Sequence, residues 1–381
     1  MKWLAFRLLF VSILSVGVVS SINCESEQPP TSKYVEISIN STAHEDYGLG
    51  YPVTYEFSIP AGLSQAKAYH EHALQDSWEQ LTEKTSNDFF NGIECVRFDF
   101  ISRHAFVSVA FDGSSDDIFI QVTDSGGWLQ YINFIKICPY YDNRKCAITA
   151  TGDTDYVSQA ALDAWCDAYQ SRHIWASVAM ITSLGGSSID WNALNSQLAQ
   201  GYLEVVSHSR THPYVPFADY DSEVNGSKQD IVNNLDLPSF QKKGSSEYVV
   251  GWVEPYGLSD SAERAKLGQY KYLCDRDVTR DDSWAAWDAT NGLYERIGTS
   301  AQTEVDSLTK MESKFDSVYS SGGIFHIWGH VQSGDYSSTG KFCQILDYIK
   351  DKKDCWYVPF GAMYMYHYCQ ERGEISIQKS S

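Results

Sequence analysis

Positive charge is scarce in this sequence. Its 381 residues include 29 lysines and arginines against 49 aspartates and glutamates, so the formal net charge is −20 at pH 7. A surface with this excess of negative charge repels nucleic acids and acidic lipids, and we expect no nucleic-acid partner. The sequence also lacks a phosphate-binding loop, a dinucleotide fingerprint, a GxSxG elbow and an HExxH motif, which excludes the enzyme classes built on them.

Long apolar runs are equally rare. One run covers residues 8–19, and it is shorter than the roughly 20 residues that span a bilayer. Lys2 and Arg7 precede this run and small residues follow it, so residues 1–24 are predicted to be a secretory signal peptide, cleaved after residue 21 or 24. We therefore expect a secreted, extracellular protein without a membrane anchor, whose oligomeric state the sequence leaves open.

CxxC pairs are absent, so a zinc site built from cysteines is not expected. Nine cysteines occur, and in a chain bound for an oxidising compartment they predict disulfides. Loss of Cys24 with the leader would leave an even number, whose pairing cannot be derived from spacing. Sequons at Asn40 and Asn225 predict N-glycosylation in a eukaryotic host.

The remaining composition, 43% hydrophobic and 20% charged, is typical of a globular protein. Apolar residues alternate with period two from Tyr34 to about Tyr141, which predicts a mainly antiparallel β-domain over residues 25–141. Residues 65–84 have a helical pattern, and we expect a helix beside that sheet. We interpret this domain as an accessory module for glycan binding or packing.

Strand-like and helical patterns alternate after Cys146. Seven segments are predicted strands, namely CAITAT, IWASVAMI, YLEVVS, EYVVGWV, KYLC, GIFHIW and CWYVPF. Alternation over this length predicts a parallel sheet, and seven repeats indicate an α/β fold of the distorted (β/α)7 barrel type over residues 142–372. Residues 373–381 are then a C-terminal tail.

Acids and histidines follow several of these strands, at the end where such barrels bind their substrates. The candidates are Asp153, Asp155, His208, His212, Glu254, Pro255, Tyr256, His326 and His330. Two imidazoles and a carboxylate with an open position suit zinc or another divalent first-row ion that holds a water. His208 and His212 would point to one side if their segment turns like a helix. Trp252 and Trp328 lie near strand ends and are candidates for a substrate wall.

The order of these segments resembles the polysaccharide deacetylases, the NodB-homology family of carbohydrate esterases (family four), over about residues 143–372. Residues 151–155, TGDTD, stand where the family has Thr-Phe-Asp-Asp-Gly, and residues 208–212, HSRTH, fit its His-Ser/Thr-x-x-His motif. Residues 253–257, VEPYG, resemble Arg-x-Pro-Tyr-Gly without the arginine. Residues 328–330, WGH, resemble a divergent branch of the family.

This resemblance implies a metal-dependent deacetylase acting on an N-acetylglucosamine polymer or another acetylated polysaccharide. One of Asp153 and Asp155 would bind the metal with His208 and His212, while the other would take a proton from the metal-bound water. We favour Asp153 as the base and Asp155 as the ligand. Metal binding would lower the pKa of that water toward ~7 and polarise the acetyl carbonyl.

The resemblance also implies roles for groups around the metal. The backbone N–H of Tyr256 would bind the oxyanion. His330, or alternatively His326, would protonate the leaving group. Asp282 with Trp284 is a candidate for the fourth family motif, whose acid tunes that histidine, although a surface acidic run is an equally good interpretation.

Two other functions are consistent with the sequence. The missing arginine favours a catalytically impaired barrel that acts as a carbohydrate-binding or surface-interaction protein. Asp153 and Glu254 could instead form the carboxylate pair of a glycosidase. In each case the partner is a glycan, and the acidic surface favours a neutral one, such as chitin-type oligomers or acetylated xylan, over a polyanion.

Overall fold

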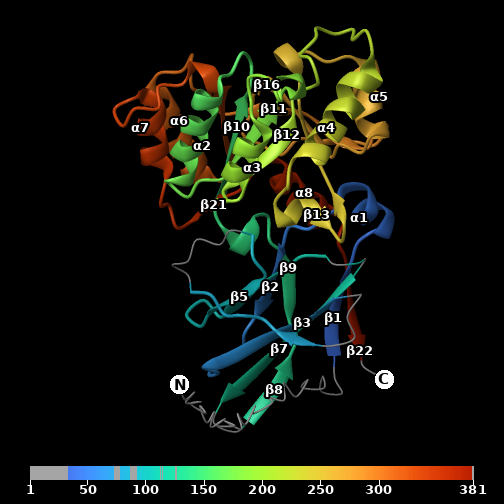
Figure 1. Ribbon diagram of the computed structural model, residues 1–381. Coiled ribbons are helices and arrows are strands. Elements are labelled where there is room, and N and C mark those ends of the chain that lie inside the picture. The colour runs from blue at the N-terminus through green and yellow to red at the C-terminus, as the bar shows by residue number, and fades with distance from the viewer. Residues whose placement is uncertain are drawn as a thin grey trace, which may run out of the picture.

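The computed structural model describes residues 33–72, 78–85, 92–111, 113, 115–124 and 127–379. The predicted signal peptide, residues 1–24, lies outside these ranges and stays a prediction. Figure 1 shows two parts, which we call the β part (residues 33–141 and 374–379) and the α/β part (residues 142–373). Within the described ranges, no helix combines the length and the apolar character needed to cross a bilayer.

Two antiparallel sheets make up the β part. The first has the order β22-β1-β7-β3-β4, with β8 paired to β7, and the second has the order β5-β6-β2-β9. The elements are β1 (Lys33–Ser38), α1 (Ser41–Tyr47), β2 (Val53–Ser58), β3 (Gln65–His72), β4 (Glu79–Gln80), β5 (Cys95–Asp99), β6 (His104–Val109), β7 (Ser115–Asp124), β8 (Gly127–Tyr131), β9 (Phe134–Ile137) and β22 (Glu374–Lys379). The period-two pattern predicted antiparallel strands, and these pairings are antiparallel.

Apolar side chains of both sheets meet in one core. Val35 of β1 and Ile118 of β7 belong to the first sheet, Tyr55 and Phe57 of β2 belong to the second, and all four are fully buried in the same cluster. Because side chains alternate along a strand, each sheet directs one set of residues toward the other sheet.

Two predictions for this region were wrong. Residues 65–84 were expected to be helical, but residues 65–72 form β3, which pairs along its whole length with β7. Its Ala, Gln, Lys and Glu residues favour a helix, and tertiary pairing overrides that preference. Residues 374–379, assigned to a tail, form β22 and pair with β1, so the chain returns to complete the first sheet (Figure 1).

The α/β part is built on a sheet of mainly parallel strands. Its order is β17-β18-β16-β15-β12-β11-β10-β20-β19, with β21 paired to β10. The strands are β10 (Cys146–Asp153), β11 (Ala176–Met180), β12 (Leu203–Ser207), β15 (Gly251–Val253), β16 (Cys274–Arg280), β17 (Trp287–Asp288), β18 (Leu293–Thr299), β19 (Ala301–Gln302), β20 (Ile324–His330) and β21 (Cys355–Tyr357). The parallel sheet confirms the predicted α/β class. Each of the seven predicted segments overlaps a strand, although KYLC shares only Cys274 with β16.

β18 lies between β16 and the antiparallel β17, and it was not predicted from the sequence. Its sequence, LYERIGT, interrupts an apolar pattern with Glu295 and Arg296, and Arg296 has a φ of 56° where the pairing with β16 shifts register. Only Ser300 separates β18 from β19, and β19 pairs in parallel with β20.

Helices follow most of the strands. They are α2 (Gln159–Gln170), α3 (Trp191–Leu198), α4 (Ser227–Asn234), α5 (Ser261–Gln269), α6 (Leu308–Ser321), α7 (Lys341–Ile349) and α8 (Phe360–Arg372). The helix α8 lies between the α/β part and the β part (Figure 1), and its residues 360–369 are all buried. Its sequence is apolar around the whole circumference, as expected for a helix without a solvent face. Tyr366 of α8 donates a hydrogen bond to the carbonyl oxygen of Cys138 at 2.9 Å, which ties the two parts together.

The eight cysteines of the described ranges are all buried. Cys146 and Cys355 are register partners at the starts of β10 and β21, and their sulfurs lie 3.3 Å apart. These two thiols are therefore close enough to be oxidised to a disulfide, although no bond joins them in the structure.

Candidate functional site

The carboxyl ends of the parallel strands surround a cavity of about 410 Å³. It is lined by Asp153, Asp155, His208, His212, Glu254, Tyr256, Gly257, Val278, Gln302, Trp328 and His330. Most of the sequence-predicted candidates therefore meet at one place, as the rule for parallel barrels predicts.

Asp155 lies between the two histidines of the HSRTH segment. Its carboxylate oxygens are 3.3 Å from Nε2 of His208 and 3.1 Å from Nε2 of His212. Nδ1 of His208 faces the carbonyl oxygen of Val253 at 2.9 Å, so that nitrogen carries the proton and donates it. Nε2 of His208 therefore presents a lone pair toward a carboxylate oxygen, an arrangement that a cation placed among the three residues would stabilise.

The charges of this group follow from its surroundings. Burial lowers the pKa of His212 to about 4, with His208 acting in the same direction, so the imidazole is neutral. Burial would raise the pKa of Asp155, but its contacts with the rings of His208 and His212 lower it to about 2. Two imidazoles and an ionised carboxylate, with one ligand atom from each within 4.8 Å of the others, form a typical site for a divalent ion.

The HSRTH segment does not form a helical turn, which corrects the reason given for its spacing. Ser209 and His212 have φ angles of 64° and 60°, and the N–H of His212 donates to Oγ of Ser209 at 2.9 Å. Glu223 accepts hydrogen bonds from the N–H groups of Arg210 and Thr211 at 3.0 and 2.8 Å. A looped backbone, fixed by a glutamate that the sequence analysis missed, thus brings the two rings to 4.7 Å.

Asp153 has a different partner, Arg276 of β16. Nη2 of Arg276 lies 2.8 and 2.7 Å from the two oxygens of Asp153, and both side chains are buried. Arg276 is the register partner of Val253, the residue at the position of the missing motif arginine. β16, the strand beside β15, therefore supplies a guanidinium at the register position where the motif lacks its arginine.

His330 and His326, the two candidates for the acid, occupy different environments. His330 lines the cavity, and its Nδ1 lies 3.2 Å from Oε1 of Glu304. This hydrogen bond raises the pKa of His330, and Asp153 adds to the effect. His326 is buried away from the cavity, with Nε2 3.0 Å from Oγ1 of Thr151, and burial lowers its pKa well below the usual value.

Glu304 therefore holds the place that the sequence analysis gave to Asp282 and Trp284. Asp282 is instead paired with Lys314 at 2.6 Å, and Trp284 stacks on His367 at 4.0 Å. Neither residue lines the cavity.

Only half of the predicted substrate wall lies at the cavity. Tyr256 and Trp328 line it, whereas Pro255 and Trp252 are buried elsewhere. Trp252 points toward α5, where its Nε1 donates to Glu263 at 2.9 Å, because alternation along β15 turns it away from the cavity. Tyr256 has a φ of 58° and its ring stacks on Tyr214 at 3.6 Å, which forms an aromatic rim.

Comparison with known proteins gives one informative result. No family model matches the sequence, and no curated protein matches it. A structure from Mycobacterium smegmatis described as a polysaccharide deacetylase aligns with a TM-score of 0.50 at 11% identity, covering 65% of this chain and 99% of that chain. This likeness shows a shared fold, and it agrees with the resemblance seen in the motifs.

Two further solved structures align with lower scores. A family 4 carbohydrate esterase from Streptomyces lividans, in complex with acetate, has a TM-score of 0.38 at 14% identity, covering 56% of this chain and 92% of that chain. The peptidoglycan deacetylase PdaC from Bacillus subtilis has a TM-score of 0.38 at 17% identity, covering 60% and 94%.

Proposed function

We propose that this chain is a metal-dependent deacetylase that hydrolyses acetyl groups from a glycan. The observation that carries the proposal is one cavity holding a His-His-Asp group, a carboxylate bound to an arginine and a histidine bound to a glutamate. These three units correspond to a metal site, a general base and a general acid. The fold shared with the Mycobacterium smegmatis structure supports this assignment.

The residues present fit a divalent first-row ion, with zinc as the expected metal. Asp155, His208 and His212 would hold it, because their donor atoms converge and the Nε2 lone pair of His208 already faces a carboxylate. A bound metal supplies a Lewis acid that lowers the pKa of a bound water and polarises a carbonyl.

The protein's own groups then handle the protons. Asp153 accepts a proton from the attacking water, and the guanidinium of Arg276 holds its carboxylate in place. His330, kept protonated by Glu304, gives the proton at Nε2 to the leaving amine or alcohol. The backbone N–H of Tyr256 is the proposed donor to the oxyanion.

The substrate proposal rests on the rim and the net charge. Tyr214 is 62% exposed and Tyr256 is 42% exposed, so their stacked rings offer an apolar face to a sugar. The net charge of −20 disfavours a polyanion, which leaves neutral N-acetylglucosamine oligomers or acetylated xylan as preferred substrates.

Two further parts of the proposal concern the closure of the parallel strands and the secretion of the protein. We infer that the parallel strands close into a ring, since β18 pairs with β16 and, one residue later, β19 pairs with β20. Secretion follows from the predicted leader, and oxidation outside the cell would join Cys146 to Cys355 first. Mass spectrometry of protein recovered from the medium tests both the cleaved leader and this bond.

The impaired-barrel alternative depended on the missing motif arginine. Arg276 occupies the position beside Asp153 that this alternative assumed to be empty of a cation. The missing motif arginine therefore no longer favours a glycan-binding protein without activity over an active deacetylase.

The test is acetate release from N-acetylglucosamine oligomers, peptidoglycan and acetylated xylan by the zinc-loaded protein. We expect release from at least one substrate, its loss with a chelator, and a loss of at least about 100-fold in His212→Gln. His173→Asn is the matched control, because His173 is exposed, outside the cavity, and has a φ of 54° that asparagine accepts. No acetate from any substrate would contradict the proposal, and new reducing ends with intact acetyl groups would indicate the Asp153 and Glu254 glycosidase instead.

A further inference from the structure

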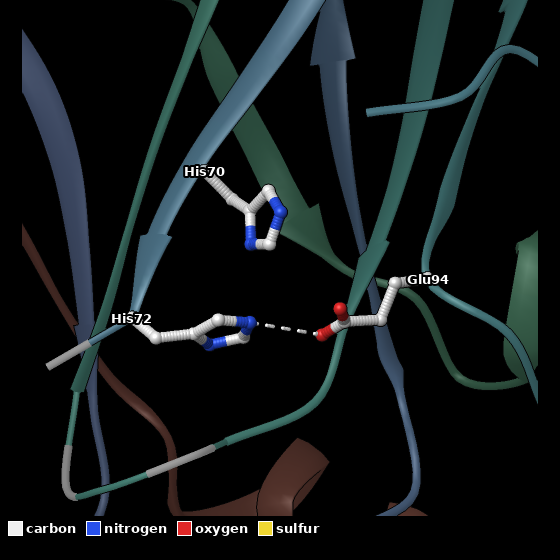
Figure 2. Close-up of side chains that lie close together, drawn as sticks. All are labelled: His70, His72 and Glu94. Carbon is white, nitrogen blue, oxygen red and sulfur yellow. Dashed lines mark ion pairs between the residues drawn. The ribbon is translucent and has the colours of Figure 1, made fainter. Parts of the chain in front are cut away.

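A second group of histidines and a carboxylate lies in the β part. His70 and His72 are two residues apart on β3, so the alternation of the strand turns both rings to the same face. Glu94 comes immediately before β5, in the other sheet. One ligand atom from each of the three residues lies within 4.8 Å of the others, and Figure 2 shows the three side chains directed toward a common space.

Both imidazoles are buried. His70 is 4% exposed and His72 is 7% exposed, and their ring centres are 4.6 Å apart at nearly a right angle. Nε2 of His72 lies 3.4 Å from Oε1 of Glu94. Two buried imidazoles in contact and beside a carboxylate are an unusual use of space between sheets that share an apolar core.

The polar atoms of this group are incompletely satisfied. Nδ1 of His70 is buried and has no hydrogen-bond partner, whereas buried polar side-chain atoms normally have one. A ring nitrogen of His70 faces His72 in Figure 2. A histidine whose inward nitrogen carries no hydrogen bond offers its lone pair to the space between the three residues.

The chemistry of the three donors suits a cation. Imidazole nitrogens and carboxylate oxygens are ligands that zinc commonly has in proteins, and each of the three residues supplies one such atom to the cluster.

We propose that His70, His72 and Glu94 bind a second divalent first-row metal ion, with zinc as the expected ion, between the two sheets of the β part. His70 would use Nδ1, His72 would use Nε2 and Glu94 would use Oε1. The ion links β3 of one sheet to the start of β5 in the other, and three protein ligands leave a fourth position for water. A site of this kind stabilises the pairing of the two sheets.

The surroundings support this arrangement. Oε2 of Glu79 lies 3.9 Å from Nε2 of His70, behind the imidazole, where a carboxylate commonly orients a ligating histidine. The N–H of Ala110 donates to Oε1 of Glu94 at 2.8 Å and fixes the carboxylate from the side of β6. The site shares no residue with the cavity of the α/β part, so it does not depend on the proposed deacetylase activity.

The test measures zinc bound per chain, by mass spectrometry of the metal after dialysis of the full-length protein. The background is His208→Gln with His212→Gln, which removes both imidazoles of the proposed cavity site, and the comparison within this background tests the second site. We expect this background to retain one zinc per chain, and addition of His72→Gln or Glu94→Gln to weaken zinc binding at least tenfold. His104→Gln is the matched control, because His104 also belongs to the β part and pairs with a glutamate, Glu56, but lies outside the cluster.

A second measurement separates loss of the site from loss of the fold. Glu94 is 34% exposed, so Glu94→Gln is the milder change, and its circular dichroism spectrum should match that of the background. Zinc should raise the melting temperature of the background and of His104→Gln, and it should not raise that of Glu94→Gln. A background protein that keeps no zinc, or one whose zinc content is unaffected by His72→Gln and Glu94→Gln, would overturn the proposal whatever the acetate assay shows.

Discussion

Two buried carboxyl groups at opposite ends of the parallel strands, Asp153 and Glu204, have different partners. At the carboxyl end, Asp153 faces the guanidinium of Arg276 at 2.7 Å. Near the amino end, Glu204, the second residue of β12, accepts hydrogen bonds from Ser177 at 2.7 Å and from the N–H of Gly361 at 2.8 Å, without a cation. Burial raises the pKa of Glu204 to about 7. Asp153 is therefore paired with a cation beside the cavity, whereas Glu204 is held by hydrogen-bond donors and anchors α8.

The largest effect is expected from removal of the cation at the carboxyl end. Arg276→Met leaves Asp153 buried without its partner, which should lower the free energy of unfolding by about 3–5 kcal/mol. Denaturant unfolding measures this change. Asp153→Asn added to Arg276→Met should restore part of the stability but none of the acetate release, because Asp153 is the proposed base.

This double variant shows whether Arg276 positions the carboxylate of Asp153 for catalysis or only stabilises the fold. If the double variant recovered acetate release together with stability, Arg276 would act only through the fold, and Asp153 would not be the base. Arg276→Lys is the conservative control, and it should keep more stability than Arg276→Met because the charge remains.

The amino end should affect stability and not chemistry. Glu204 holds its proton more tightly in the folded protein, so its ionisation opposes folding as the pH rises from about 4.5 to about 7. Below this window the ionisation of Glu204 does not change the free energy of unfolding. Above the window it lowers the free energy of unfolding by its full amount, on the order of 3 kcal/mol. Glu204→Gln should remove this pH dependence and should be the more stable protein at pH 8, as measured by urea unfolding across the pH range.

Acetate release should be unchanged in Glu204→Gln. Glu45→Gln is the control, since Glu45 is exposed on α1, and it should leave the pH dependence of unfolding as in the parent. Loss of activity in Glu204→Gln would break the distinction between the two ends of the strands.

The parts of the fold predicted from sequence were those whose burial leaves a continuous apolar signal. All residues of β10 and β11 are buried, as expected for strands covered on both faces, and both segments were recognised. β18 carries two charged residues and was missed, while β3 was mistaken for a helix because its pairing with β7 is not visible in its own residues.

The candidate site divides in the same way. Asp155, His208 and His212 were identified because they lie in two short motifs, TGDTD and HSRTH, that come at the ends of predicted strands. Arg276 was missed because its contact with Asp153 joins residues 123 positions apart through strand order and register. Glu304 lies 26 positions before His330 and outside any predicted motif, so only the fold reveals it.

The smallest effect is expected at Glu304, within the carboxyl end itself. Its hydrogen bond raises the pKa of His330, and the proposed acid must be protonated, so activity falls as the pH rises through that pKa. Glu304→Gln keeps an oxygen for the hydrogen bond but loses the charge, which should move the alkaline limb of the kcat/KM profile to lower pH by roughly one unit. Unfolding should change little, because the amide oxygen introduced by Glu304→Gln can accept the same bond from the N–H of His330. An alkaline limb that stays in place would remove His330 from the role of general acid, because the acid is the group whose loss of a proton ends activity at high pH.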